Sequence, residues 1–177
     1  MTVLDRVGPL LDSWRVDWAL IGASAMAAWG VSRSTLDVDV LVTDASLLST
    51  ERWAGLRPEG FTVTVSRGDA DDPLAGVVRL RSATERPLDV VVGRSAWQRA
   101  LLRRCQRISV AGTSIPIASP ADLVLLKLYA GGAQDAWDVQ QLLGASRDRP
   151  ALVAEVEAAL GDLPEESRTL WLRLRAE

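Results

Sequence analysis

The stretch from residue 18 to residue 42 constrains the fold more than any other part of the chain. It reads WALIGASAMAAWGVSRSTLDVDVLV. Its first four residues are apolar and predict a buried strand. A turn of small residues comes next, at Gly22, Ala23 and Ser24, and opens a short helix. A second strand follows a glycine-led loop, so this stretch predicts a sheet with helices packed on it.

The second predicted strand carries two carboxylates, Asp37 and Asp39. Because side chains in a strand alternate between faces, both carboxylates project together while the apolar residues around them face the other way. Two adjacent carboxylates repel each other, and a divalent cation makes the pair favourable. The same spacing recurs at Asp69 and Asp71 in a polar loop, so the spacing alone also fits a solvated surface. The glycine turn before the strand favours the metal-site interpretation, because free N–H groups at a helix start bind phosphate.

The residue types that are rare or absent exclude several kinds of site. With no histidine and a single cysteine, Cys105, the chain has no Ser-His-Asp triad, no His-based zinc site and no internal disulfide. Carboxylates must therefore do any acid–base and metal work. Lys127 is the only lysine, since the other basic residues are all arginine. It suits a role that needs a compact point charge, although a lone lysine can also survive by chance.

Composition and charge are those of an ordinary folded domain. Hydrophobic residues make up 48% of the chain and charged residues 24%. With a net charge of −3, the chain has no global basic field, so any RNA binding would depend on a local basic patch. The first residues lack the regions of a signal peptide, and the longest uncharged run is too short to cross a bilayer. These features predict a cytoplasmic protein without membrane contact.

The rest of the chain alternates between predicted strands and helices. Predicted strands span residues 61–65, 77–81, 88–92 and 108–117, the last of them with a turn at Gly112. Predicted helices span residues 3–14 with an interruption near Pro9, 44–54 with an end at Gly55, 95–107, 120–130, 134–143, 150–160 and 164–175. We therefore expect an α+β core over residues 1–118 and a C-terminal helical part over residues 119–177, packed on that core.

Asp89 is the only charge in its predicted strand of leucine and valine. Such a carboxylate lies either at a strand end near solvent or in a functional cleft. If this strand lies beside Asp37 and Asp39, three carboxylates converge on one point. Two metal ions that share bridging oxygens need such a set.

Four arginines form a candidate polyanion-binding stripe on the predicted helix 95–107. They are Arg99, Arg103, Arg104 and Arg107. Their spacing of about four residues places them on one helix face, where a solvated surface is the ordinary alternative. Lys127 lies in an apolar helix, from which it either extends outward to solvent or points into a cleft that needs positive charge.

These motifs together resemble the nucleotidyltransferase superfamily that includes DNA polymerase beta, antibiotic nucleotidyltransferases and minimal bacterial enzymes. Within it the chain looks most similar to AbiEii-type toxin-like nucleotidyltransferases. The family pattern is a hydrophobic-Gly-[Gly/Ser] turn, Arg-x-[Ser/Thr]-x-Asp-hydrophobic-Asp, a third acidic strand, and a late Lys-bearing helix followed by an acidic helix. The matching residues are Ile21-Gly22-Ala23, Arg33-Ser34-Thr35-Leu36-Asp37-Val38-Asp39, Asp89, Lys127, Asp135 and Asp138.

The resemblance implies a mixed β-sheet flanked by helices and a role for each matching residue. Asp37, Asp39 and Asp89 would bind two Mg²⁺ ions, and Asp89 would accept the proton of the acceptor hydroxyl. Lys127 would neutralise the triphosphate of an NTP such as ATP, with Asp135 or Asp138 orienting it. The remaining implied nucleotide-binding residues are Gly22, Ala23, Ser24, Arg33 and Thr35.

The resemblance implies transfer of an NMP from an NTP to an acceptor hydroxyl, with an RNA or tRNA end as acceptor and a protein antitoxin as partner. A small antibiotic or sugar is the alternative acceptor. Ala23 departs from the family pattern, in which Gly or Ser follows the glycine, so a non-catalytic binding module of the same fold is a second alternative. A third is an interaction protein whose seven tryptophans form packing surfaces.

Overall fold

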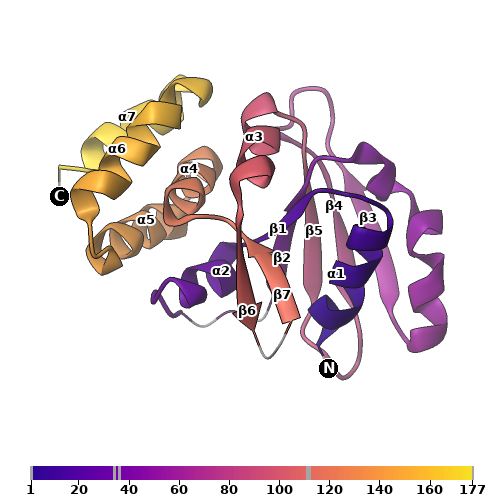
Figure 1. Cartoon of the computed structure of the whole chain (residues 1–177). Coiled ribbons are helices and arrows are strands. Elements are labelled where there is room, and N and C mark those ends of the chain that lie inside the picture. Colours follow the sequence, from indigo (N-terminus) through magenta and orange to yellow (C-terminus); the bar gives the residue numbers. More distant parts are fainter. Residues whose placement is uncertain (1, 34, 36, 111–112, 177) are drawn as a thin grey trace. The chain divides into compact units, whose positions relative to one another are not determined.

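The computed structural model describes residues 2–33, 35, 37–110 and 113–176 (Figure 1). They form two compact units. The sheet unit comprises Met1–Ser24 and Ser34–Ala118, and the helical unit comprises Ala25–Arg33 and Ser119–Glu177. Two motif residues, Ser34 and Leu36, and the turn expected at Gly112 lie outside the described residues.

A seven-stranded mixed sheet forms the centre of the sheet unit in the part of the chain that the structure describes. Its strands are β1 (Trp18–Ile21), β2 (Val38–Val42), β3 (Thr62–Arg67), β4 (Leu74–Arg81), β5 (Leu88–Gly93), β6 (Gln106–Val110) and β7 (Thr113–Ile117). Their order is β3-β4-β5-β2-β1-β7-β6. Strand β2 pairs antiparallel with β1 and parallel with β5. The predicted α+β architecture, a mixed β-sheet flanked by helices, is confirmed.

Side-chain alternation gives the sheet one strongly apolar face. Val40, Val78 and Val90 lie in one cross-strand row and are fully buried. Helix α1 (Val3–Ser13) contributes buried residues to the same core. Gly8 lets it approach the sheet, because a Cβ at that position would lie 3.0 Å from the Trp18 ring. The Trp18 indole N–H also donates to Asp12 of the helix, at 2.9 Å.

Two predicted helical segments run or end differently from the sequence prediction. Helix α1 continues through Pro9, because burial of its apolar face outweighs the backbone bond that proline cannot make. The segment after Asp44 is two 3₁₀ helices, η1 (Ala45–Leu48) and η2 (Thr50–Glu59). It ends at Gly60 and not at Gly55, because Gly60 has the left-handed conformation (φ 86°) that terminates helices.

Helix α3 (Ala96–Arg104) is shorter than predicted, because the chain becomes extended at Cys105 and joins β6. Arg107 therefore lies on a strand, opposite Pro116 of β7, and its guanidinium donates to the side chain and carbonyl of Ser114. The prediction that four arginines share one helix face was wrong for Arg107. In this segment, pairing with β7 is more favourable than continuation of helix α3.

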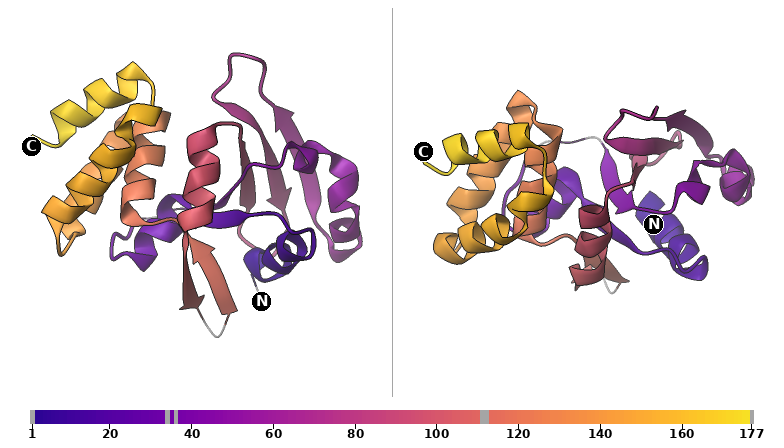
Figure 2. Two further views of the ribbon diagram at one scale, coloured as in Figure 1. Left: turned by 45° about the horizontal axis from the view of Figure 1, so that its top comes forward. Right: turned by 90° about the horizontal axis from the view of Figure 1, so that it is seen from above.

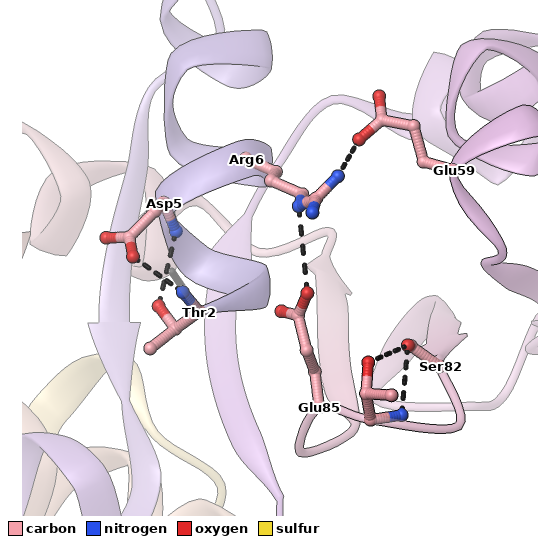
Figure 3. A network of polar contacts seen from close by, with 7 residues as sticks. Thr2, Asp5, Arg6, Glu59, Ser82 and Glu85 are labelled. Atoms are coloured by element: carbon pink, nitrogen blue, oxygen red, sulfur yellow. Dashed lines mark hydrogen bonds and ion pairs between the residues drawn. The ribbon is translucent and has the colours of Figure 1, made fainter.

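A network of charged side chains ties helix α1 to the β4–β5 hairpin (Figure 3). Arg6 forms ion pairs with Glu59 at the end of η2 and with Glu85 in the hairpin loop, the latter at 3.7 Å. Thr2 and Asp5 form a reciprocal capping box that fixes the first turn of α1. The hairpin is thus anchored at its loop.

The helical unit is built from helices that pack together (Figure 2). They are α4 (Pro120–Ala130), α5 (Ala133–Ala145), α6 (Arg149–Ala159), the 3₁₀ turn η3 (Leu160–Asp162) and α7 (Glu165–Leu174). The short helix α2 (Gly22–Ala28) begins in the sheet unit and ends in the helical unit. Ser119 caps α4 and Gly131 ends it in the left-handed conformation, as the sequence predicts. Over the residues described, no helix has both the length and the apolar character that a bilayer span requires.

Candidate functional site

Two of the predicted site carboxylates lie directly opposite each other on neighbouring strands. Asp39 of β2 is the register partner of Asp89 of β5, and Ile21 of β1 is the partner of Asp39 on its other side. Residues paired across a sheet point to the same face, so both carboxylates share one face. Asp89 is only 6% exposed, although its side chain is charged. The sequence prediction that this strand brings a third acid beside the Asp37–Asp39 pair agrees with this register.

Asp37 immediately precedes β2 and is held by a local turn. The Thr35 hydroxyl accepts from the Asp37 backbone N–H at 3.3 Å and donates to the Asp37 carbonyl at 3.2 Å. Both contacts depend on one side-chain oxygen. Thr35 therefore fixes the backbone from which the Asp37 carboxylate extends.

Gly22 lies directly beside the carboxylate of Asp39. Its φ of 63° is in the left-handed region, which favours glycine. A Cβ built at this position would lie 3.1 Å from Cγ of Asp39 and closer still to its Oδ2. Glycine is therefore required here by backbone conformation and by the approach of Asp39.

The departure at Ala23 does not strain the turn. Among the described residues, Arg15 is the only non-glycine with a positive φ, so Ala23 adopts an ordinary conformation. Its methyl group is buried, 2% exposed. Ser24, which follows it, is half-buried and carries the hydroxyl nearest in sequence to the turn.

The structure adds Arg79, which the sequence interpretation missed. Arg79 of β4 is the register partner of Asp89, and its Nε donates to Asp89 Oδ1 at 2.7 Å while Nη2 pairs with Oδ2. The pKa of Arg79 is raised by the hydrogen bond and charge of Asp89 and further by the charges of Asp37 and Asp39. One guanidinium is thus attracted by all three carboxylates. We call Asp37, Asp39 and Asp89 the carboxylate row.

Alternation in the sequence could have revealed this arginine. Val78 and Leu80 of the hairpin are fully buried, as are Leu88 and Val90 opposite them. Residues between buried positions face the other way. Arg79 must therefore share a face with Asp89.

The carboxylate row fits a hard divalent cation by the chemistry of its donors. Carboxylate oxygens are the ligands that Mg²⁺ prefers. The row also attracts a cationic group in this structure, namely Arg79. Within the described ranges, no three acidic, cysteine or histidine side chains lie together in a ready-made metal cluster. Asp89 has both oxygens on Arg79.

A second cluster of charges lies in the helical unit, where Lys127 of α4 meets the first turns of α5. Its Nζ lies 2.8 Å from Asp135 Oδ1 and 2.7 Å from Asp138 Oδ2. Asp138 is fully buried and also pairs with Arg33, whose Nε lies 3.2 Å from Oδ1. The structure therefore brings together Arg33, Lys127, Asp135 and Asp138, all of which the sequence motif singled out.

Lys127 stays charged in this setting. Burial by itself would lower the pKa of Lys127, but its hydrogen bonds to Asp135 and Asp138 and their charges outweigh burial, so the pKa is raised above its usual value. The two carboxylates also hold the ammonium in one orientation. Lys127 therefore presents a fixed positive charge.

Three exposed arginines, Arg99, Arg103 and Arg104, remain on helix α3. The Arg99 guanidinium donates to the Arg94 carbonyl at 3.2 Å. Arg107 is exposed on β6, outside this helix. The basic surface is therefore smaller on the helix than the sequence predicts.

Comparison with solved structures identifies the fold. The chain is similar to ANT(2'')-Ia in complex with adenylyl-2''-tobramycin, with a TM-score of 0.58 and 12% identity over 90% of this chain and 95% of that one. The solution structure of the antibiotic-resistance factor ANT(2'')-Ia matches with a TM-score of 0.55 and 10% identity, over 88% of each chain. A candidate nucleotidyltransferase from Thermotoga maritima matches with a TM-score of 0.56 and 17% identity, over 81% of this chain and 92% of that one.

No protein-family model matches the sequence, and no curated protein matches it. Identities this low show a shared fold and leave the chemistry to be argued from the residues. The chain thus has a nucleotidyltransferase-like fold, as the sequence motifs predict.

Proposed function

We propose that this protein transfers an NMP from an NTP to an acceptor hydroxyl, with Mg²⁺ held by Asp37, Asp39 and Asp89. The observation that carries the proposal is the register of Asp39 with Asp89, beside a glycine that the Asp39 carboxylate closely approaches. Asp39 and Asp89 share one face of the sheet, and adjacent carboxylates repel each other unless a cation offsets their charge. Mg²⁺ bound there would neutralise charge on the phosphates and on the attacking oxygen.

In this proposal, separate residues bind the phosphates and accept the proton. Gly22, Ala23 and Ser24 offer backbone N–H groups to the terminal phosphates. The acceptor oxygen forms a bond to the α-phosphorus, the bond from that phosphorus to the bridging oxygen breaks, and pyrophosphate leaves with the electron pair. The proton of the hydroxyl passes to Asp89. Catalysis then comes mainly from positioning and charge neutralisation, which needs no histidine.

In this proposal, the charged cluster of Arg33, Lys127, Asp135 and Asp138 acts on the triphosphate and not on the metal. Lys127 would neutralise charge on the triphosphate, and Asp135 and Asp138 would keep its ammonium oriented. Its raised pKa supports this role, because the side chain is then fully charged at neutral pH. Arg33 shares Asp138 with Lys127 and would hold that carboxylate in place.

A transfer assay with radiolabelled nucleotides tests the proposal. Purified protein, Mg²⁺ and each of the four α-labelled NTPs are incubated with total RNA, and label in RNA is measured. We expect label from one nucleotide, lost in Asp39→Ala. Retention of transfer by Asp39→Ala would overturn the proposal.

The chain supplies a matched control for this variant. Asp69 and Asp71 have the same spacing as the site pair, but Asp71 is exposed in a loop. Asp71→Ala removes an identical side chain away from the carboxylate row. It should fold and transfer label like the wild type, which separates loss of the site from loss of any aspartate.

RNA is the first acceptor to test. The exposed arginines of helix α3 supply the local positive charge that the acidic chain as a whole lacks. Replacement of Arg99, Arg103 and Arg104 by serine should reduce labelling of RNA. An unchanged rate would exclude this surface. The AbiEii-type resemblance, a protein antitoxin partner and a cytoplasmic location stay predictions.

A small hydroxylated molecule is the second candidate acceptor. ANT(2'')-Ia, a similar structure, was crystallised with adenylyl-2''-tobramycin. The same assay with aminoglycosides in place of RNA tests this acceptor. It should be insensitive to the arginine replacements. If neither acceptor is labelled and calorimetry detects no Mg-NTP binding, the chain is a non-catalytic module of this fold.

A further inference from the structure

Arg79 stands at the end of a row of charged residues that crosses three neighbouring strands. The register pairs Asp39 with Asp89 and Asp89 with Arg79, so the order across β2, β5 and β4 is carboxylate, carboxylate, guanidinium. Paired residues share a face, so the three side chains project to the same side of the sheet. Arg79 therefore lies on the face of the carboxylate row, directly beside Asp89.

The contact between Arg79 and Asp89 involves both carboxylate oxygens. Nε donates to Oδ1 at 2.7 Å and Nη2 pairs with Oδ2, which is the planar two-pronged geometry that arginine forms with carboxylates. Asp89 is 6% exposed, so loss of this partner would leave a buried carboxylate without a compensating charge. The Arg79 side chain is 42% exposed, so it can leave Asp89 for solvent at lower cost.

A divalent cation and the Arg79 guanidinium compete for the same carboxylate. A cation that approaches Asp89 from the side of β4 must displace at least one of the two N–H bonds. A cation that approaches from the other side still meets the repulsion of the guanidinium. In both cases the positive charge of Arg79 weakens binding of the cation.

We propose that Arg79 is the resident counter-ion of the carboxylate row and that a divalent cation binds there in competition with it. This inference rests on the proposed function, in which the row holds Mg²⁺. Arg79 is a positioning residue that keeps buried Asp89 neutralised when no cation is bound. The cation then binds strongly only when the phosphates of an NTP add negative charge beside the row.

Calorimetry with Mn²⁺ alone, confirmed by electron paramagnetic resonance, tests the competition without any turnover. Arg79→Gln should bind Mn²⁺ about tenfold more tightly than the wild type, which corresponds to about 1.4 kcal/mol. Arg79→Lys keeps the charge and should stay close to the wild type. The gain should disappear when Asp39→Ala is added to Arg79→Gln, because the row has then lost a ligand.

Arg81→Gln is the matched control. Arg81 lies two residues further along β4 on the same face and is exposed. Its replacement removes the same charge from the same face without freeing Asp89, and should change Mn²⁺ affinity less than twofold. Unchanged or weaker Mn²⁺ binding by Arg79→Gln, or an equal gain in Arg81→Gln, overturns the inference. Both measurements report Mn²⁺ affinity and not transfer activity. A negative result here would therefore contradict the competition by Arg79 without contradicting the proposed transferase function.

A melting experiment gives a second, independent readout. Without divalent cation, Arg79→Gln should melt below the wild type, because Asp89 has lost its counter-ion. Added Mg²⁺ should raise the melting temperature of Arg79→Gln more than that of the wild type. An equal rise in both proteins contradicts competition.

Discussion

The backbone of Gly22 lies against the carboxylate of Asp39. A side chain at position 22 would lie 3.1 Å from Cγ of Asp39 and closer to Oδ2, so no Cβ fits there without movement of Asp39. The contact joins the end of β1 to the carboxylate row. The glycine motif and the acidic motif of the sequence therefore form one structural feature.

Gly22→Ala should weaken Mn²⁺ binding at the carboxylate row below the affinity of the wild type. The new methyl group displaces the Asp39 carboxylate, and the positive φ adds about 1–2 kcal/mol of strain. Calorimetry measures the loss. Gly60→Ala is the matched control, because Gly60 has φ 86° and open space around it. It should carry the strain but keep the wild-type affinity, so an equal loss in both variants contradicts the role of the Gly22–Asp39 contact.

Thr35→Val should weaken Mn²⁺ binding about fivefold while leaving the fold intact. The variant keeps the shape of the side chain but loses the hydroxyl that contacts the Asp37 backbone in both directions, and a hydrogen bond contributes about 1 kcal/mol net. Thr35→Ser keeps the hydroxyl and should bind like the wild type. If valine and serine behave alike, the hydroxyl does not position Asp37.

The sequence predicts most strands and the acidic motifs because their patterns are local. The alternation in β4 and the apolar runs of β1 and β5 are visible in a few consecutive residues. The pairing of Asp39 with Asp89 needs the strand order, which no local pattern encodes. Alternation in β4 indicates which face Arg79 occupies, but its position directly opposite Asp89 also depends on the strand pairing.

Helix ends were harder to predict than strands. Gly55 lies in the middle of η2 and Gly60 directly follows its last residue, and only Gly60 has a left-handed φ. Arg107 continues the helical spacing of the α3 arginines, yet pairing with β7 takes it into a strand. In both cases a tertiary contact or a backbone angle decides between equal local patterns.

Asp138→Ala should destabilise the protein by about 3 kcal/mol, more than Asp135→Ala. Asp138 is fully buried between Lys127 and Arg33, and removal of one member of a buried ion pair leaves its partners unneutralised. Asp135 is 21% exposed in its side chain, so its pair with Lys127 is screened by water and we expect about 1 kcal/mol. Urea unfolding followed by circular dichroism measures both. Equal losses would contradict the buried position of Asp138.

The stabilising effect of Lys127 should disappear at alkaline pH. Its pKa in the folded protein lies above the unfolded value of about 10.4, because Asp135 and Asp138 outweigh burial. The charged form therefore stabilises the fold fully below about pH 10.4, and the contribution is lost as pH rises through the folded pKa.

Melting temperatures of wild type and Lys127→Met, measured from pH 7 to pH 11.5, test this dependence. We expect a constant difference at neutral pH and a shrinking difference above about pH 10.4. Lys127→Arg provides the control, because arginine keeps its charge over this range, so any advantage it has over methionine should persist. A wild-type melting temperature that rises relative to Lys127→Met between pH 7 and pH 9 would mean that Lys127 is neutral in the folded protein, because the unfolded chain then binds more protons than the folded one. That result would contradict the charge-neutralising role proposed for Lys127.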